Sequence, residues 1–227
     1  MSQRLVPWPR AAAAVLAGCA LVVAAMSIAY HRERTGTAFD DVVDRFIRKG
    51  SPRLMNDIVH VADPEFVALL FLVLIAVALV RRRPDIALLA LLTPIGSVLL
   101  VEHVLKPLVH RTQSDPYVVH AFGYEPLAFP SGHESGIGSF IAVCGLLVLG
   151  SGWRLRTRVG VLVAMALAGL VAAIGLVGRY YHYATDTIGA MLVCTAVTLT
   201  VGFAVDAIFL RIRPHDRATA GRSPAVS

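Results

Sequence analysis

The sequence predicts an all-α protein, a six-transmembrane helix bundle with both termini cytoplasmic and an interfacial helix in the first outer loop. Of its 227 residues, 56% are hydrophobic and only 16% are charged, and the mean hydropathy is +0.69. A soluble domain with this balance would expose too much apolar surface. Apolar runs of the length that crosses a bilayer alternate with short basic segments, which is typical of a multi-pass membrane protein.

Six apolar runs predict the six spans. In order, they lie near residues 11–30, 65–80, 85–104, 134–150, 160–177 and 183–210. The first run follows Arg4 and Arg10, as a secretory signal would, but about 20 apolar residues exceed a usual signal core, so we predict a span. Residues 1–213 are therefore predicted to form a single membrane domain. Residues 214–227, rich in Pro, Gly, Ser and Ala, are predicted to be a disordered cytoplasmic tail.

The basic residues predict the orientation of the bundle. With the N-terminus inside, the inner segments hold 12 of the 21 Lys and Arg residues. These are Arg4, Arg10, Arg81, Arg82, Arg83, Arg154, Arg156, Arg158, Arg211, Arg213, Arg217 and Arg222. Short basic connections stay in the cytoplasm, so we place both termini there. The net charge of +6 is thus interpreted as an orientation signal, and nucleic acid is not a predicted partner.

The first outer loop is predicted to contain a helix that lies on the membrane surface. Between Phe39 and Ile47, apolar residues fall on one helical face and charged residues on the other. A short helix with this pattern lies flat at the boundary between lipid and water. We interpret it as a surface helix, with a lid over a lipid entrance as the alternative.

Ionisable residues gather in the remaining outer connections, all at one face of the membrane. They are Glu102, His103, Lys106, His110, Arg111, His133, Glu134, Arg179, His182 and Asp186, with Ser131 and Gly132 among them. Charged groups at the ends of spanning helices need partners or water, and a cluster of them indicates a functional site. Interfacial anchoring is the alternative for any single member.

The segment from Phe129 to Glu134 places a small turn directly before the fourth span, and that turn predicts an anion site. Free backbone N–H groups and the helix dipole favour negative charge at a helix N-terminus. Ser131 can donate a further hydrogen bond, and Gly132 lets an oxyanion approach the backbone. His133 would then stand beside the bound anion.

A second histidine is predicted to be held by a carboxylate. His182 and Asp186 are four residues apart and share a face if the sixth helix has begun. An aspartate that accepts from one imidazole nitrogen leaves the other basic, as a nucleophile or general base requires. Lys106, Arg111 and Arg179 would supply cations for phosphate. These residues alone leave open which histidine attacks.

From Glu102 to Ala190 the chain resembles the type-2 phosphatidic acid phosphatase superfamily, integral membrane lipid phosphatases related to vanadium haloperoxidases. The three matching motifs run over residues 106–111, 130–133 and 179–186. The resemblance implies that His182 is the nucleophile that forms a phosphohistidine, that Asp186 orients it and that His133 protonates the leaving oxygen. It also implies a phosphate-binding set, which consists of Lys106, Arg111, Ser131, Gly132 and Arg179.

Two spacings depart from that family's pattern. Only four residues separate Lys106 from Arg111, and Gln113 stands where the family has its arginine. In the third motif two residues separate Arg179 from His182, and Leu176 holds the expected arginine position. Glu102, His103, His110 and Glu134 have no family counterpart. Glu134 begins the fourth span, where a carboxylate favours the helix dipole.

The sequence thus predicts a lipid phosphatase of a bacterial plasma membrane, with its active site facing outward. The substrate would be a polyprenyl diphosphate, phosphatidic acid or a related membrane lipid phosphate. We expect neither a metal ion nor another cofactor, because three cations can neutralise phosphate and the carboxylates are scattered. The alternatives are a lipid or anion transporter and an inactive lipid-binding protein. Charges at one face, away from the membrane midplane, disfavour transport.

Overall fold

The computed structural model describes residues 4–47, 52–113, 118–120 and 123–212. Its helices are α1 (Pro9–Ala29), α2 (Ala38–Ile47), α3 (Pro52–Val59), η1 (His60–Ala62), α4 (Pro64–Val80), α5 (Pro84–Leu100), η2 (Val101–Leu105), α6 (Lys106–Val109), α8 (Gly132–Leu149), α9 (Leu155–Gly178) and α10 (Ala184–Ile212). Within the described ranges, the sole β-type pairing is an isolated bridge between Thr112 and Leu127. The all-α class is therefore confirmed.

Five of these helical segments are long and apolar enough to cross a membrane. They are α1, the continuous run Pro84–Val109, α8, α9 and α10. At 17 residues α4 is short for a span, and it qualifies only together with Arg53–Ala62, from which it is bent by 40°. A multi-pass membrane protein is supported by these helices, while the sixth span stays a prediction.

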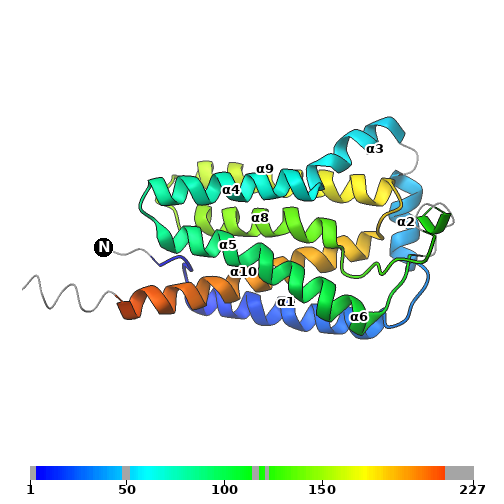
Figure 1. The fold of residues 1–227 in the computed structure, drawn as a ribbon, viewed down its shortest axis with the longest axis horizontal. Helices are drawn as coiled ribbons and strands as arrows, with labels where there is room; N and C mark the ends of the chain where they lie inside the picture. The colour runs from blue at the N-terminus through cyan, green and yellow to red at the C-terminus, as the bar shows by residue number, and fades with distance from the viewer. Residues whose placement is uncertain (1–3, 48–51, 114–117, 121–122, 213–227) are drawn as a thin grey trace, which may run out of the picture.

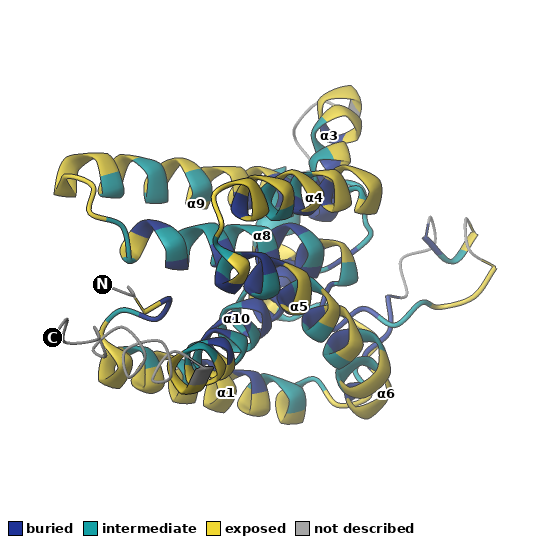
Figure 2. Ribbon diagram, turned by 60° about the vertical axis from the view of Figure 1, so that its left-hand side comes forward, coloured by how far each residue is buried: buried dark blue, intermediate teal, exposed yellow. Residues whose placement is uncertain are grey.

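The bundle is built around α8 and α10 (Figure 1). Helix α8 packs against α5, α9 and α10, and α10 also packs against α1. Figure 2 shows that buried residues concentrate on these inner helices, whereas α1, α4 and α9 are exposed along their outer faces. In the apolar helix α1 only Cys19 and Val23 are buried. Apolar residues that face outward in this way suit a lipid environment.

Proline residues set several helix boundaries. Pro9, Pro64 and Pro84 each stand in the first turn of their helix, where a missing N–H costs nothing. Pro107 acts differently, because it cannot donate to the carbonyl four residues earlier and so interrupts the regular ladder. The π-helical turn η2, Val101–Leu105, lies directly before it. Single π turns of this kind often occur at functional sites.

The two ends of the bundle differ. The N-terminus, the α4–α5 and α8–α9 connections and the end of α10 lie at one end, and α2 lies across the other (Figure 1). All four predicted inner segments therefore share an end. The predicted surface helix is present as α2, with Val42 and Phe46 exposed. Its place relative to a membrane remains a prediction, and the predicted tail 214–227 lies outside the described residues.

Candidate functional site

An apolar groove of about 580 Å³ runs between α4, α5 and α8 and ends at polar groups. Its walls carry Val67, Phe71, Leu72, Ile75, Leu91, Ile95 and Val98, among others. At the polar end lie Glu102, Lys106, Gly132 and His133. The groove therefore joins a surface suited to an alkyl chain with groups that can bind an anion.

The π turn and α6 position the charged pair of this polar end. Lys106 Nζ donates to Glu102 Oε1 at 2.7 Å, and the two side chains are 14% and 37% exposed. Gly132 lies against both groups, and a Cβ at this position would collide with Glu102 Oε1 and come within 3.3 Å of Lys106 Nζ. A side chain at this position would therefore displace the Glu102 carboxylate from the start of α8.

The predicted helix N-terminus forms at the expected place. Ser131 is the N-cap of α8, and its Oγ accepts from the N–H of Glu134 at 3.1 Å. Ser131 is fully buried, so in this structure its hydroxyl caps the helix and does not line the groove. Gly132 and His133, the first two residues of α8, do line it, and His133 is exposed.

His182 is held by a backbone carbonyl, and this corrects the expected bond to Asp186. His182 Nδ1 lies 3.0 Å from the Ala128 oxygen, but 3.8 Å from Asp186 Oδ2. The reason is that α10 begins at Ala184, so His182 stands before the helix. A carbonyl can only accept, so Nδ1 carries a proton, and in the neutral ring Nε2 is then the nitrogen with the lone pair.

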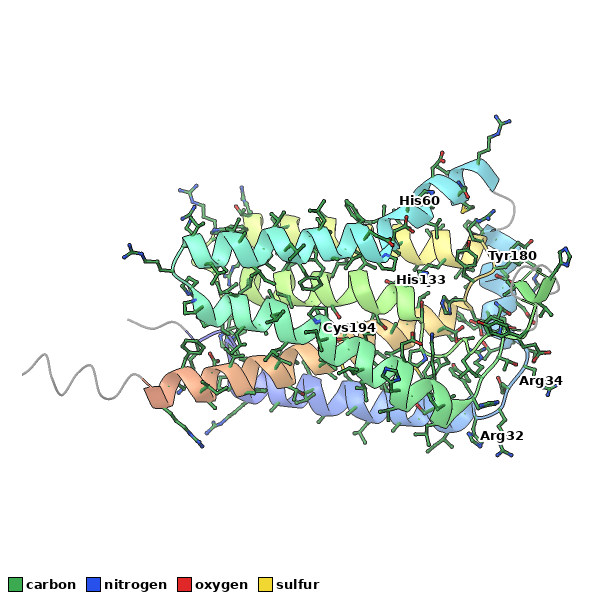
Figure 3. The ribbon with its side chains drawn as sticks, viewed as in Figure 1. Arg32, Arg34, His60, His133, Tyr180 and Cys194 are labelled. Atoms are coloured by element: carbon green, nitrogen blue, oxygen red, sulfur yellow. The ribbon has the colours of Figure 1, made fainter. Side chains whose placement is uncertain are left out.

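The two histidines are close neighbours in a row of side chains. The ring centroids of His133 and His182 lie 6.1 Å apart, and the His133 ring stacks on Tyr181 at the same separation. Arg179 follows, with its guanidinium carbon 6.0 Å from the Tyr181 centroid. In Figure 3 His133 and Tyr180 lie toward the end of the bundle opposite the N-terminus. His182 itself, 7% exposed, is not among the described residues that line the groove.

Arg111 does not face the groove, which corrects its expected phosphate contact. It is fully buried, and its guanidinium donates to Asp186 Oδ1 at 2.6 Å and to Asp40 Oδ2 at 3.0 Å. Tyr30 and Tyr183 cover the guanidinium, with ring centroids 4.5 and 4.4 Å from its central carbon. The physical reason is the left-handed turn at His110, φ 54°, which ends α6 and directs the next residue inward.

Asp40 pairs with Arg111, as Asp186 does, and the sequence did not single it out. It caps the start of α2 by accepting from the N–H of Thr37, and it also accepts from the N–H of Thr185 at 2.8 Å. Burial by itself would raise the pKa of Asp40, but these hydrogen bonds and the one from Arg111 outweigh it and hold the pKa below its usual value. The TxxD spacing of Thr37 and Asp40, a helix-start pattern, was the available signal.

The two residues at the family's arginine positions lie away from the groove. Gln113 is buried and donates from Nε2 to the Tyr180 carbonyl at 3.1 Å, and Leu176 belongs to the hydrophobic core. Glu134 lies in the first turn of α8, as expected, and it is fully buried. Neither of its carboxyl oxygens has a hydrogen-bond partner among the described residues. Glu134 borders a separate apolar groove of about 450 Å³ between α2, α9 and α10.

Comparisons with known proteins add no relative. No family model matches the chain, and neither a curated protein nor a solved structure matches it significantly. In the described part of the chain, no group of three His, Cys, Asp or Glu residues is arranged to hold a metal ion.

Proposed function

We propose that this protein is an integral membrane lipid phosphatase that hydrolyses a phosphomonoester or diphosphate of a membrane lipid without a metal ion. The observation that supports this proposal is the apolar groove of about 580 Å³ that ends at Lys106, His133 and the start of α8. A lipid chain fits the apolar walls, and its phosphate would lie against an ammonium group and free backbone N–H groups.

The two histidines then divide the chemistry. His182 Nε2 attacks phosphorus, and the bond from phosphorus to the leaving oxygen breaks, which is the lipid oxygen of a monoester or the bridging oxygen of a diphosphate. Protonated His133 gives its proton to that oxygen. In the second step His133, now neutral, takes a proton from water, whose oxygen attacks the phosphohistidine and releases inorganic phosphate and His182. The Ala128 carbonyl supports this division, since it keeps the proton on His182 Nδ1.

The proposal includes a topology. The bent pair Arg53–Ala62 and Pro64–Val80 would provide the sixth span. The end of the bundle that carries the basic connections would face the cytoplasm of a bacterial cell. The groove's polar end and α2 would then lie at the outer face, with α2 at the lipid–water boundary.

A lipid-binding protein without catalytic activity is the second candidate. It is favoured by one observation, that His182 is 7% exposed and does not line the groove, whereas His133 does. In that case a lipid phosphate would bind at Lys106 and not be cleaved.

Phosphate release separates the two candidates. The purified full chain in detergent, with EDTA present, is assayed on polyprenyl diphosphate, phosphatidic acid and phosphatidylglycerol phosphate. We expect release by the wild type and a loss of about 10³-fold or more in His182→Ala and His133→Ala, because each removes a group that acts in the transition state. His103→Ala, at an exposed histidine outside the groove, is the matched control. Lack of release by the wild type, or full activity in His182→Ala, refutes the phosphatase.

A further inference from the structure

We propose that Glu102 makes this site select lipid phosphates that carry an ammonium group beside the phosphate, as esters of a long-chain amino alcohol do. This inference rests on the proposed function and specifies its substrate class. It starts from the groove's polar end, where a carboxylate stands among the groups that would receive the phosphate.

The charges that line the groove nearly cancel. Among the described residues that line it, Lys106 and Glu102 are the charged ones, with a single histidine, His133. Arg111 is paired with Asp40 and Asp186, so it contributes no free cation to the groove. A phosphomonoester carries a charge of about −1.5 to −2 at neutral pH. Even with His133 protonated for its role as the acid, the lining therefore leaves part of a simple lipid phosphate uncompensated, and it also sets a carboxylate next to it.

Glu102 lies where it would repel a bound phosphate directly. Its Oε1 lies 2.7 Å from Lys106 Nζ and against Gly132, so it reaches the start of α8 where the anion would bind. A phosphate that approaches Lys106 from the groove must come close to Glu102. Like charges at such a distance repel, and both partly leave water when the groove is filled.

An ammonium group on the substrate removes the repulsion. The order Lys106, phosphate, substrate ammonium and Glu102 alternates in charge, so every group has an opposite neighbour. An ionised carboxylate has about four acceptor sites, and the hydrogen bond from Lys106 uses one of them. Glu102 can therefore keep its contact with Lys106 and accept from the substrate as well.

Two matched substrates test the inference. They are alkyl phosphates of equal chain length, one of which has an amine on the carbon beside the ester carbon. We measure kcat and KM in mixed micelles for the wild type, Glu102→Gln, Glu102→Asp and Glu65→Gln. Glu65 is exposed on α4 outside the groove, so Glu65→Gln is a control for the loss of one negative charge.

We expect the wild type to favour the amine-bearing lipid by about tenfold to a hundredfold in kcat/KM, mainly through KM. Glu102→Gln should bring this preference close to one and improve KM for the amine-free lipid. Glu102→Asp should retain part of the preference, and Glu65→Gln all of it. Equal use of both lipids by the wild type, or an unchanged preference in Glu102→Gln, overturns the inference while the phosphatase stands.

Binding separates this inference from the proposed function. The corresponding alkyl phosphonates cannot be hydrolysed, and their dissociation constants can be measured by calorimetry for the same variants. A preference for the amine that depends on Glu102, without hydrolysis of either phosphate, refutes the phosphatase and keeps the selectivity. If the wild type binds neither phosphonate, or both equally, the selectivity is refuted.

Discussion

Two charged clusters lie at the same end of this protein and are built in opposite ways. Their cations, Lys106 and Arg111, are five residues apart in sequence. Arg111 is fully buried between Asp40 and Asp186, with two tyrosine rings over its guanidinium. Lys106 pairs with one carboxylate, that of Glu102, and both side chains border an open groove. The first cluster is closed on itself, whereas the second is open to a ligand.

The difference shows that neighbouring cations in one motif need not share a role. Arg111 joins α2 to the start of α10, because Asp40 and Asp186 come from these two helices. Removal of such a buried group should harm the fold, while removal of Lys106 should harm the binding of an anion. The comparison therefore predicts that stability and activity depend on different residues.

The largest effect is expected for Arg111→Ala. This change leaves Asp40 and Asp186 buried without their cation, which typically costs about 3–5 kcal/mol of unfolding free energy. Thermal unfolding in detergent measures the loss. Arg111→Lys should rescue only part of it, because an ammonium group cannot reproduce the two-sided fork. An unchanged melting temperature would show that the closed cluster does not stabilise the fold by linking α2 to α10.

Lys106→Ala should give the complementary result. We expect a fall of about 10²-fold in phosphate release, the usual loss when one preorganised donor is removed from a transition state. Because Lys106 borders a groove and does not lie in the core, the melting temperature should stay near that of the wild type. A large loss of stability in this variant would contradict the contrast between the clusters.

Acid should weaken the closed cluster selectively. The pKa of Asp40 is held below its usual value, so its stabilising contribution is present above the unfolded pKa of about 3.9 and is lost as pH falls through the lowered one. Unfolding curves from neutral pH to below about pH 3 measure this loss. Asp40→Asn should be less stable at neutral pH but show a flatter decline in acid. A parallel decline in both proteins would argue against Asp40 as the source.

The smallest effect is expected at Glu134, which belongs to neither cluster. Since its carboxyl oxygens have no partner among the described residues, the apolar surroundings suit an uncharged group of the same shape. Glu134→Gln should change the unfolding free energy by less than about 1 kcal/mol, the net value of one ordinary hydrogen bond. A loss of several kcal/mol in the same unfolding assay would indicate an ionised Glu134 with a cationic partner.

Local patterns predicted the fold better than they predicted the site. The fourth span, predicted from near residue 134, begins as α8 at Gly132, and the helix predicted over residues 39–47 appears as Ala38–Ile47, one residue longer than expected. The burial of Arg111 could not be predicted in this way, because its partner Asp40 lies 71 residues earlier in the chain. The pairing arises only when α2 folds across the end of the bundle.

The predicted hydrogen bond between His182 and Asp186 is not formed, for a related reason. Their spacing of four residues suits a helix, but α10 starts between them, and a carbonyl from the preceding loop reaches the imidazole first. Spacing predicts contacts within an element, whereas a contact at a boundary depends on where the element begins. The sequence showed that Gln113 and Leu176 stand where the similar family has arginines, but it did not show that both side chains are buried.

The apolar groove between α4, α5 and α8 has a kinetic consequence. Its wall residues Leu72, Leu91 and Ile95 are 63%, 47% and 48% exposed, so the groove opens on the apolar side of the bundle. If that side faces lipid, as the proposed function requires, a lipid substrate arrives by two-dimensional diffusion within the bilayer. The rate of loading then follows the mole fraction of that lipid in the membrane, and diluting it with inert lipid slows the protein at constant bulk concentration.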